Sequence, residues 1–315
     1  MIRKPSIYFV LIAILHFVAC SPDDVPNNGV LENKMLEVAY SINSFNVDGI
    51  ATRATDAGTT AEQQVDNLYL LLFDGGGANP KRYFIDSATF TGGTWDAANR
   101  KITLSLTQAE AGNRQVYVVA NISAALKTTL DGVATLTALK TVAVTNNTPW
   151  SPGLTTLILM SGNATHNFVA NRTLSTVSLI RALAKVELNI TLPAVHQDAN
   201  PLNYKYKFID FDKKTYVLKP DSKPNDLVNF PTTGWQDWQQ AGVVASYGVV
   251  SGKVATLKIV AYLNERNNAG SYIDIQLPYN PGGPLPPPEF GNDTFKLPLA
   301  GEVKRNHWYK YDVTL

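Results

Sequence analysis

The amino-acid sequence predicts an all-β protein composed of β-sandwiches. Many short apolar segments of strand length occur along the chain, and turn signals separate them. Helical periodicity is confined to one predicted helix between Ser123 and Lys140. The chain has 315 residues, of which 45% are hydrophobic and 17% charged, so it is long enough for about two domains with separate cores.

The N-terminal residues 1–19 have the pattern of a signal peptide. Arg3 and Lys4 precede an apolar run, residues 7–18, which is too short to span a membrane but has the length of a signal-peptide core. This run leads into Cys20, the only cysteine of the sequence, and its flanking residues resemble the lipobox of bacterial lipoproteins. We therefore expect a lipid on Cys20; the alternative is an ordinary secretory signal with an incidental cysteine.

Residues 20–35 are predicted to form a lipidated tether, rich in Pro, Asn and Asp, between the anchor and the fold. The acidic pair Asp23 and Asp24 lies close behind Cys20, and this placement resembles the export tag that carries some Gram-negative lipoproteins to the cell surface. The expected location is therefore the outer membrane, with the lipid as the anchor and the folded part exposed at the surface.

The first predicted strand of the fold covers residues 36–43. Its apolar residues alternate along one face: Leu36, Val38, Tyr40 and Ile42. A polar stretch, residues 51–64, separates it from the nearly continuous apolar run VDNLYLLLF at residues 65–73, which predicts a strand in the middle of a sandwich. Further strands in this half are predicted at residues 82–85, 101–107, 115–120 and 155–160.

The second half is predicted to consist of strands joined by loops. These strands are expected at residues 185–192, 204–211, 215–219, 253–263, 272–277 and 308–315. The long strand pattern that begins at residue 183 opens a second domain, which places the boundary within about ten residues of 176–183. We therefore predict an N-terminal domain at residues 36–180 and a C-terminal domain at residues 181–315.

Candidate catalytic and metal-binding residues do not form a recognisable constellation. Beyond the signal peptide the sequence has His166, His196 and His307, and none has the H-x-H or H-E-x-x-H spacing of a zinc site. A nucleophile, a base and an orienting group cannot be assembled from the motifs, so we expect no enzyme activity, no cofactor and no metal. The 27 basic and 26 acidic residues provide no positive field, which argues against nucleic acid as a partner.

Two tryptophans offer an alternative function. Trp235 and Trp238, in the segment GWQDWQQ, could stack on a sugar ring, or they could pack onto a sandwich from a loop. On the first interpretation the chain would be a cell-surface lipoprotein that binds glycan on a host or bacterial surface.

A series of motifs extends over nearly the whole mature chain. They are TRAT (52–55), VDNLYLLLFD (65–74), VYVVAN (116–121), ILMSG (158–162), RALAKVELNI (181–190), YLNE (262–265) and VKRNHWYKYDVTL (303–315). Together with the lipobox at Cys20, and in this order, they resemble the FimA/Mfa-like fimbrillin family, the subunits of type V pili of anaerobic Gram-negative bacteria. The resemblance implies two transthyretin-like β-sandwich domains in tandem, and a structural fimbrial subunit or pilus-associated adhesin without enzyme activity.

The resemblance also implies a mechanism of assembly. In that family the subunit is exported as a lipidated precursor, an arginine-specific protease removes the N-terminal segment, and the vacated groove accepts a strand from a neighbouring subunit. Here Arg53 and Ala54 would flank the cut, so residues 36–53 would leave together with the strand that carries Leu36, Val38, Tyr40 and Ile42. The alternative is a permanent strand and a surface arginine. The expected partners are other fimbrial subunits, either copies of this chain or a stalk protein.

The C-terminal end departs from the family pattern. Stalk subunits carry further strands after an RN-x-x-Y motif, and these serve as the donor, whereas here Arg305 to Tyr309 is followed only by residues 310–315. A subunit with an acceptor groove and no free donor would cap a polymer, as a tip subunit does. The other interpretation is that the last strand swings out as a donor, since its residues alternate as a donor requires: Tyr309, Tyr311, Val313 and Leu315.

Overall fold

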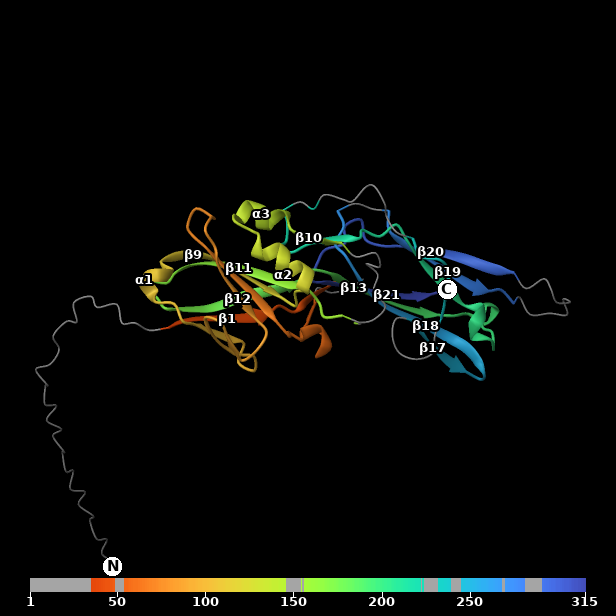
Figure 1. Ribbon diagram of the computed structural model, residues 1–315. Helices are drawn as coiled ribbons and strands as arrows, with labels where there is room; N and C mark the ends of the chain where they lie inside the picture. Colours follow the sequence, from red (N-terminus) through yellow and green to blue (C-terminus); the bar gives the residue numbers. More distant parts are fainter. Residues whose placement is uncertain are drawn as a thin grey trace, which may run out of the picture. The chain divides into compact units, whose positions relative to one another are not determined.

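Strands dominate the computed structural model, which confirms the predicted all-β fold (Figure 1). The structure describes residues 35–48, 54–145, 154, 156–221, 223, 232–238, 245–267, 270–280 and 291–315. Over these residues the strands form four sheets, all within one unit of the chain, residues 33–315. The smallest sheet pairs β10 (Ala143–Thr145) with β15 (Lys214–Tyr216).

The largest sheet has nine strands in the described part of the chain. Their spatial order is β5 (Lys81–Ile85), β4 (Leu68–Phe73), β9 (Asn113–Ala120), β11 (Met160–Asn167), β12 (Thr173–Arg181), β1 (Leu36–Ile42), β8 (Lys101–Leu104), β7 (Gly93–Asp96) and β6 (Thr89–Phe90). The pair β1 and β12 is parallel, while the other neighbours run antiparallel. The predicted strand at residues 155–160 begins only at Met160.

Two further sheets build the second half. The order of the six-stranded sheet is β17 (Ala245–Val250), β18 (Lys253–Leu263), β13 (Ala184–Thr191), β21 (His307–Thr314), β2 (Phe45–Asp48) and β3 (Ala54–Asp56), as far as the described residues go. The four-stranded sheet contains β16 (Gln236–Asp237), β14 (Lys205–Ile209), β19 (Tyr272–Pro278) and β20 (Asn292–Pro298). β13 and β21 are parallel. The six-stranded sheet combines β2 and β3 from the N-terminal part of the chain with β21 from its C-terminal part.

The predicted helix at residues 123–140 is divided into two. Ser123 caps α2 (Ala124–Asp131), Gly132 ends it, and Thr135 caps α3 (Leu136–Thr141) by accepting a hydrogen bond from a backbone amide. The buried leucines of both helices, Leu126, Leu130 and Leu139, pack on Tyr69, Leu71 and Val119 of β4 and β9. The third α-helix of the described residues is α1 (Gln108–Ala111), and 3₁₀ turns occur at Ala61–Gln63, Ala194–His196 and Pro201–Asn203. Within the described ranges, no helix has the length and apolar character to span a membrane.

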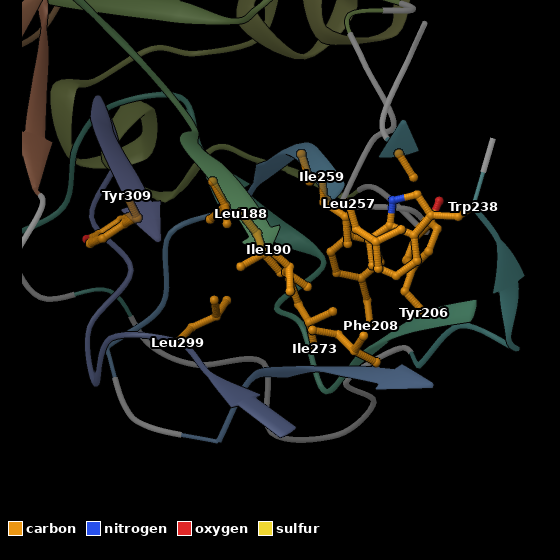
Figure 2. Close-up of a cluster of buried hydrophobic side chains, with 14 of the residues drawn as sticks. Leu188, Ile190, Tyr206, Phe208, Trp238, Leu257, Ile259, Ile273, Leu299 and Tyr309 are labelled. Carbon is orange, nitrogen blue, oxygen red and sulfur yellow. The ribbon is translucent and has the colours of Figure 1, made fainter. Parts of the chain in front are cut away.

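Alternating side chains of the strands form the two largest hydrophobic clusters. One cluster lies on a face of the nine-stranded sheet and contains Leu68, Leu70 and Leu72 of β4. The other lies between the six-stranded and four-stranded sheets, and Figure 2 shows Leu188 and Ile190 of β13 facing Ile273 of β19 within it. Burial of these faces is the main stabilising contribution to such sheets.

Candidate functional site

The first predicted strand is part of a segment that belongs to two sheets. This bridging segment, residues 36–48, contains β1 in the nine-stranded sheet and β2 in the six-stranded sheet. β1 lies between two strands, since it pairs antiparallel with β8 and parallel with β12. Figure 1 shows β1 beside β12. Removing β1 would therefore leave backbone donors and acceptors without partners along both neighbours.

The apolar face of β1 fills a slot in the core. The side chains of Leu36 and Val38 are fully buried, Tyr40 is nearly so, and Ile42 packs at the edge of the same cluster. The hydroxyl of Tyr40 accepts a hydrogen bond from Nε1 of Trp95, with 3.2 Å between the two atoms. Burial raises the pKa of Tyr40, so this hydroxyl is neutral at neutral pH.

β2 continues the segment in the other sheet. It pairs in parallel with the start of β21, from Asn46 opposite His307 to Asp48 opposite Tyr309, and antiparallel with β3. Oδ2 of Asp48 lies 2.5 Å from Nδ1 of His307. Among the described strands β3 pairs with no other, so its place in the sheet depends on β2.

The chain passes between the sheets through Asn43 and Ser44, and two side chains hold this crossing. Nη1 of Arg181 donates a hydrogen bond to the carbonyl oxygen of Asn43 (2.7 Å), and Nδ2 of Asn306 donates one to the carbonyl oxygen of Ser44 (2.7 Å). Nη1 of Arg181 also donates to Oδ1 of Asn306 (3.1 Å), and the amide of Asn46 donates to the backbone oxygen of Asn306 (2.9 Å). Arg181 and Asn306 thus act as one polar unit around the crossing.

Arg181 lies fully buried at the end of β12, and its other nitrogens also have partners. Nε donates to the carbonyl oxygen of Glu62 and Nη2 to that of Ala57, both at 2.9 Å. Burial lowers the pKa of Arg181 to about 10, and the nearby Glu62 carboxylate opposes this shift. The guanidinium therefore stays charged at neutral pH and ties the residues after β3 to the crossing.

Phe45, the first residue of β2, fills an aromatic slot beside the crossing. Its side chain is fully buried, with the ring centroid 4.0 Å from Cζ of Arg181 and 6.3 Å from the ring centroid of Trp308. A guanidinium over an aromatic face is attracted by the electrons of the ring. Gly58 closes the slot: its φ is +81°, and a Cβ there would lie 3.0 Å from Cε2 of Phe45.

Glu62 is the buried counter-charge of this region. Its Oε1 lies 2.8 Å from Nζ of Lys185 and accepts a hydrogen bond from the Tyr262 hydroxyl (2.6 Å), while Oε2 accepts one from the Thr59 amide (2.6 Å). Burial by itself would raise the pKa of Glu62, but these hydrogen bonds hold it below the ordinary value of 4.5. Glu62 is therefore ionised at neutral pH and joins the residues after β3 to β13 and β18.

The loop that carries Asn306 is anchored by its neighbour Arg305. Nε of Arg305 donates to Oε2 of Glu265 (2.7 Å), and Nη2 donates to the carbonyl oxygen of Tyr216 (2.8 Å). Asn306 has a φ of +58°, which asparagine tolerates better than most residues, and its amide donates to the Leu183 carbonyl oxygen (2.7 Å). The fixed backbone directs the Asn306 side chain at the crossing.

The four residues predicted for a C-terminal donor lie on β21 and just after it. β21 pairs with β13 from Trp308 opposite Lys185 to Thr314 opposite Thr191. The four residues pack on one hydrophobic cluster: Tyr309 is buried within it, and Tyr311, Val313 and Leu315 are partly buried against it. If this strand left its sheet, an apolar face would be exposed and one side of β13 would be unpaired.

Trp235 and Trp238 differ in exposure. Trp238 is 2% exposed, its ring centroid is 5.1 Å from that of Tyr206, and its Nε1 donates to the Lys258 carbonyl oxygen (Figure 2). Trp235 is 39% exposed, with Nζ of Lys207 lying 4.5 Å from its ring centroid. The structure therefore places one indole in the core and the other at the surface, and the two do not share an exposed face.

The remaining predicted residues lie in separate surroundings. The nitrogens of His166, His196 and His307 contact the oxygens of different residues, namely Asn171, Pro278 and Asp48. The described residues contain no group of three or more His, Cys, Asp and Glu that could hold a metal ion. Cys20 and Arg53 lie outside the described residues, while Ala54 is exposed at the start of β3.

The site residues predicted from the sequence do not include Arg181, Asn306 or Glu62. Arg181 opens the motif RALAKVELNI, and a charged residue within an apolar strand pattern is the signal that could have revealed it, because buried charges require partners. Asn306 belongs to the C-terminal motif, but nothing local shows that it faces residue 44. Glu62 lies in a polar stretch and carries no comparable signal.

Comparisons with known proteins identify fimbrial relatives. Residues 39–223 match the family model of the major fimbrial subunit protein (FimA), and residues 182–314 match that of the minor fimbrium tip subunit MfA4, C-terminal. The minor fimbrium tip subunit MfA4 of Porphyromonas gingivalis is 41% identical to this chain over 334 residues, and the alignment covers 99% of this chain and 100% of that protein.

Two solved structures have a similar fold. A candidate cell adhesion protein from Bacteroides eggerthii DSM 20697 aligns with a TM-score of 0.54 and 17% identity, covering 90% of this chain and 87% of that one. The tip fimbrial protein Mfa3 from Porphyromonas gingivalis, with a C-terminal truncation, aligns with a TM-score of 0.52 and 12% identity, covering 88% and 94%. At these identities the similarity concerns the fold alone. The family-model matches and the full-length similarity at 41% identity show that this chain belongs to the family of fimbrial subunits that includes the minor fimbrium tip subunit MfA4.

Proposed function

We propose that this fimbrial subunit acts at the tip of a fimbrium by accepting a β-strand from a neighbouring subunit. Its role is structural, with other fimbrial subunits as partners, and it catalyses no reaction. The observation that carries the proposal is the bridging segment, because this one short stretch completes both large sheets. The 41% identity to a minor fimbrium tip subunit supports the position at the tip.

Cleavage after Arg53 would separate the bridging segment from the rest of the chain. Departure of β1 would open an apolar slot between β8 and β12, and departure of β2 would uncover the start of β21. An incoming strand would restore the main-chain hydrogen bonds and fill the slot with alternate side chains. Ala54, the first residue after the cut, is exposed, which suits a cleavable site.

The position of β21 supports acceptance without donation. This strand is held by β13 along its length and by the hydrophobic cluster under Tyr309 and Tyr311. Freeing it as a donor would cost the subunit its own core face, whereas the bridging segment can be replaced by an equivalent strand. A subunit that accepts a strand and keeps β21 in its own sheet would end a polymer.

The N-terminal features complete the proposal. A lipid on Cys20 would hold the precursor on the outer membrane, exposed at the cell surface, until an arginine-specific protease cuts the chain. The division into domains at residues 36–180 and 181–315 is part of the same proposal. In its support, one large hydrophobic cluster contains only residues from 184 onward, and the other contains residues 36–179 together with Tyr262.

Limited proteolysis tests the activation step. We expect an arginine-specific protease to convert the full chain into one stable product that begins at Ala54, as read by N-terminal sequencing. The Arg53→Gln variant should resist this cut, while Arg82→Gln, which changes an exposed arginine of β5, should be cut like the parent. On an unboiled gel the product alone should show no ladder. A ladder would contradict the tip role, and fragmentation without a stable product would contradict the activation step.

A further inference from the structure

The crossing of the bridging segment has contacts that strand pairing does not supply. The carbonyl oxygens of Asn43 and Ser44 lie between β1 and β2, and their hydrogen-bond donors are the side chains of Arg181 and Asn306. If the segment departed, Arg181 and Asn306 would lose these two acceptors. Because both side chains are buried, water would not readily replace the lost hydrogen bonds. A buried donor that loses its partner is costly, and the site therefore favours an occupant that returns a carbonyl oxygen to each of them.

The pattern of burial changes at the same point. Along β1 the core side chains occupy even positions, from Leu36 to Ile42, whereas in β2 the fully buried side chain is Phe45. Asn43 and Ser44, the two crossing residues, thus shift the buried side chains from even to odd positions. A strand with uninterrupted alternation that filled the β1 slot would therefore present the wrong side chain to the slot of Phe45.

We infer that Arg181, Asn306 and the slot of Phe45 form a socket that selects the strand this subunit accepts. The inference rests on the proposed function. The occupant is an extended segment of a neighbouring fimbrial subunit that crosses between the sheets through two residues. It carries an aromatic side chain at the position equivalent to Phe45, nine residues after the position equivalent to Leu36.

The walls of the slot define the chemistry of that side chain. The guanidinium of Arg181 covers one face of the Phe45 ring, and the Trp308 ring meets it at 67°. An aromatic ring gains from both contacts, through the cation over its face and the edge-to-face packing. An aliphatic side chain fills the volume but loses these two attractions, and a small one leaves a cavity beside a buried charge.

Peptide exchange on the cleaved protein tests the socket. The probe is a fluorescent peptide with the sequence of residues 35–48. The full chain is first cleaved at Arg53, and brief exposure to urea followed by dilution then lets the probe replace the cleaved segment. Unlabelled peptides then compete, and fluorescence anisotropy gives the concentration for half-displacement. We expect Phe45→Ala to raise this concentration by at least about 100-fold, Phe45→Leu to have an intermediate effect and Phe45→Tyr to remain close to the parent.

Two further peptides distinguish the contribution of the socket to peptide binding from that of strand pairing. Val47→Ala removes a partly exposed apolar side chain from β2, and it should displace the probe within about threefold of the parent. Deletion of Ser44 keeps every other side chain but removes the shift in alternation, so it should weaken displacement as strongly as Phe45→Ala. If the Phe45→Ala and Ser44-deletion peptides compete like the parent, the socket is refuted while the accepting groove stands. If the parent peptide itself does not bind, the proposed function and the socket fall together.

Discussion

The Glu62→Gln variant is expected to lose about 3–5 kcal/mol of unfolding free energy at neutral pH. Glu62 is fully buried, and its carboxylate is the charged partner of Lys185, whose Nζ lies 2.8 Å away and is itself almost completely buried. Glutamine keeps the shape but leaves the ammonium without a counter-charge in the interior. Urea unfolding followed by circular dichroism measures the loss.

The same variant should change the dependence of stability on pH. The folded state holds the pKa of Glu62 below 4.5, so its carboxylate contributes stability that is complete above about pH 4.5 and is lost as the pH falls through the folded-state pKa. In the parent the unfolding free energy should therefore fall on acidification below about pH 4.5. In Glu62→Gln the part of this decrease that comes from protonation of Glu62 should be absent.

A matched variant on a neighbouring strand position provides the control. Glu187 on β13 pairs with Lys258 at 2.7 Å, but the lysine is partly exposed to solvent. Glu187→Gln should therefore change the unfolding free energy by at most about 1 kcal/mol. Equal losses of unfolding free energy in Glu62→Gln and Glu187→Gln would show that the buried Glu62 network stabilises the fold no more than a partly exposed ion pair does.

The second large effect is expected for Arg181→Met, which should also lower the unfolding free energy by about 3–5 kcal/mol. The substitution removes the donors that serve the carbonyl oxygens of Asn43, Ala57 and Glu62, and it removes the cation over Phe45. Urea unfolding again provides the measurement. Arg181→Lys keeps a charge without the planar fork and should fall between the parent and the methionine variant.

The control for Arg181 is the partly exposed Arg172, which directly precedes β12. Arg172→Met should change the unfolding free energy by no more than about 0.5 kcal/mol. A loss below about 1 kcal/mol for Arg181→Met would contradict the view that this side chain holds the crossing.

Strands whose apolar residues recur regularly could be predicted from the sequence. Strands in which a bulge or partial exposure disturbs this spacing could not. The predicted strand at residues 253–263 agrees with β18 at both ends, because its buried residues follow a clear pattern. β12 was missed because its buried residues Leu174 and Val177 are three apart, where the register with β1 shifts at a bulge. β20 was missed because its apolar face is short: only Phe295 and Leu297 pack on the core, and both are partly exposed.

The candidate site shows the same limit at longer range. The alternation of Leu36, Val38 and Tyr40 is local, so the sequence correctly indicates a face that turns out to be buried. The groups that hold the crossing come from residues 181 and 306, and no local pattern reveals which backbone atoms they meet. A contact between segments this far apart follows from the topology of the sheets and is not visible in composition or periodicity.

The pairing of β2 with β21 also determines the order in which the molecule can fold. This pair brings Asn46 against His307, 261 residues further along the chain, while β1 must find β12. Such distant pairings close large loops and fold slowly, because chain entropy is lost before the contacts form. The six-stranded sheet therefore cannot be completed until β21 has been synthesised. A premature stop within β21 would deprive β2, made at the start of translation, of its neighbour.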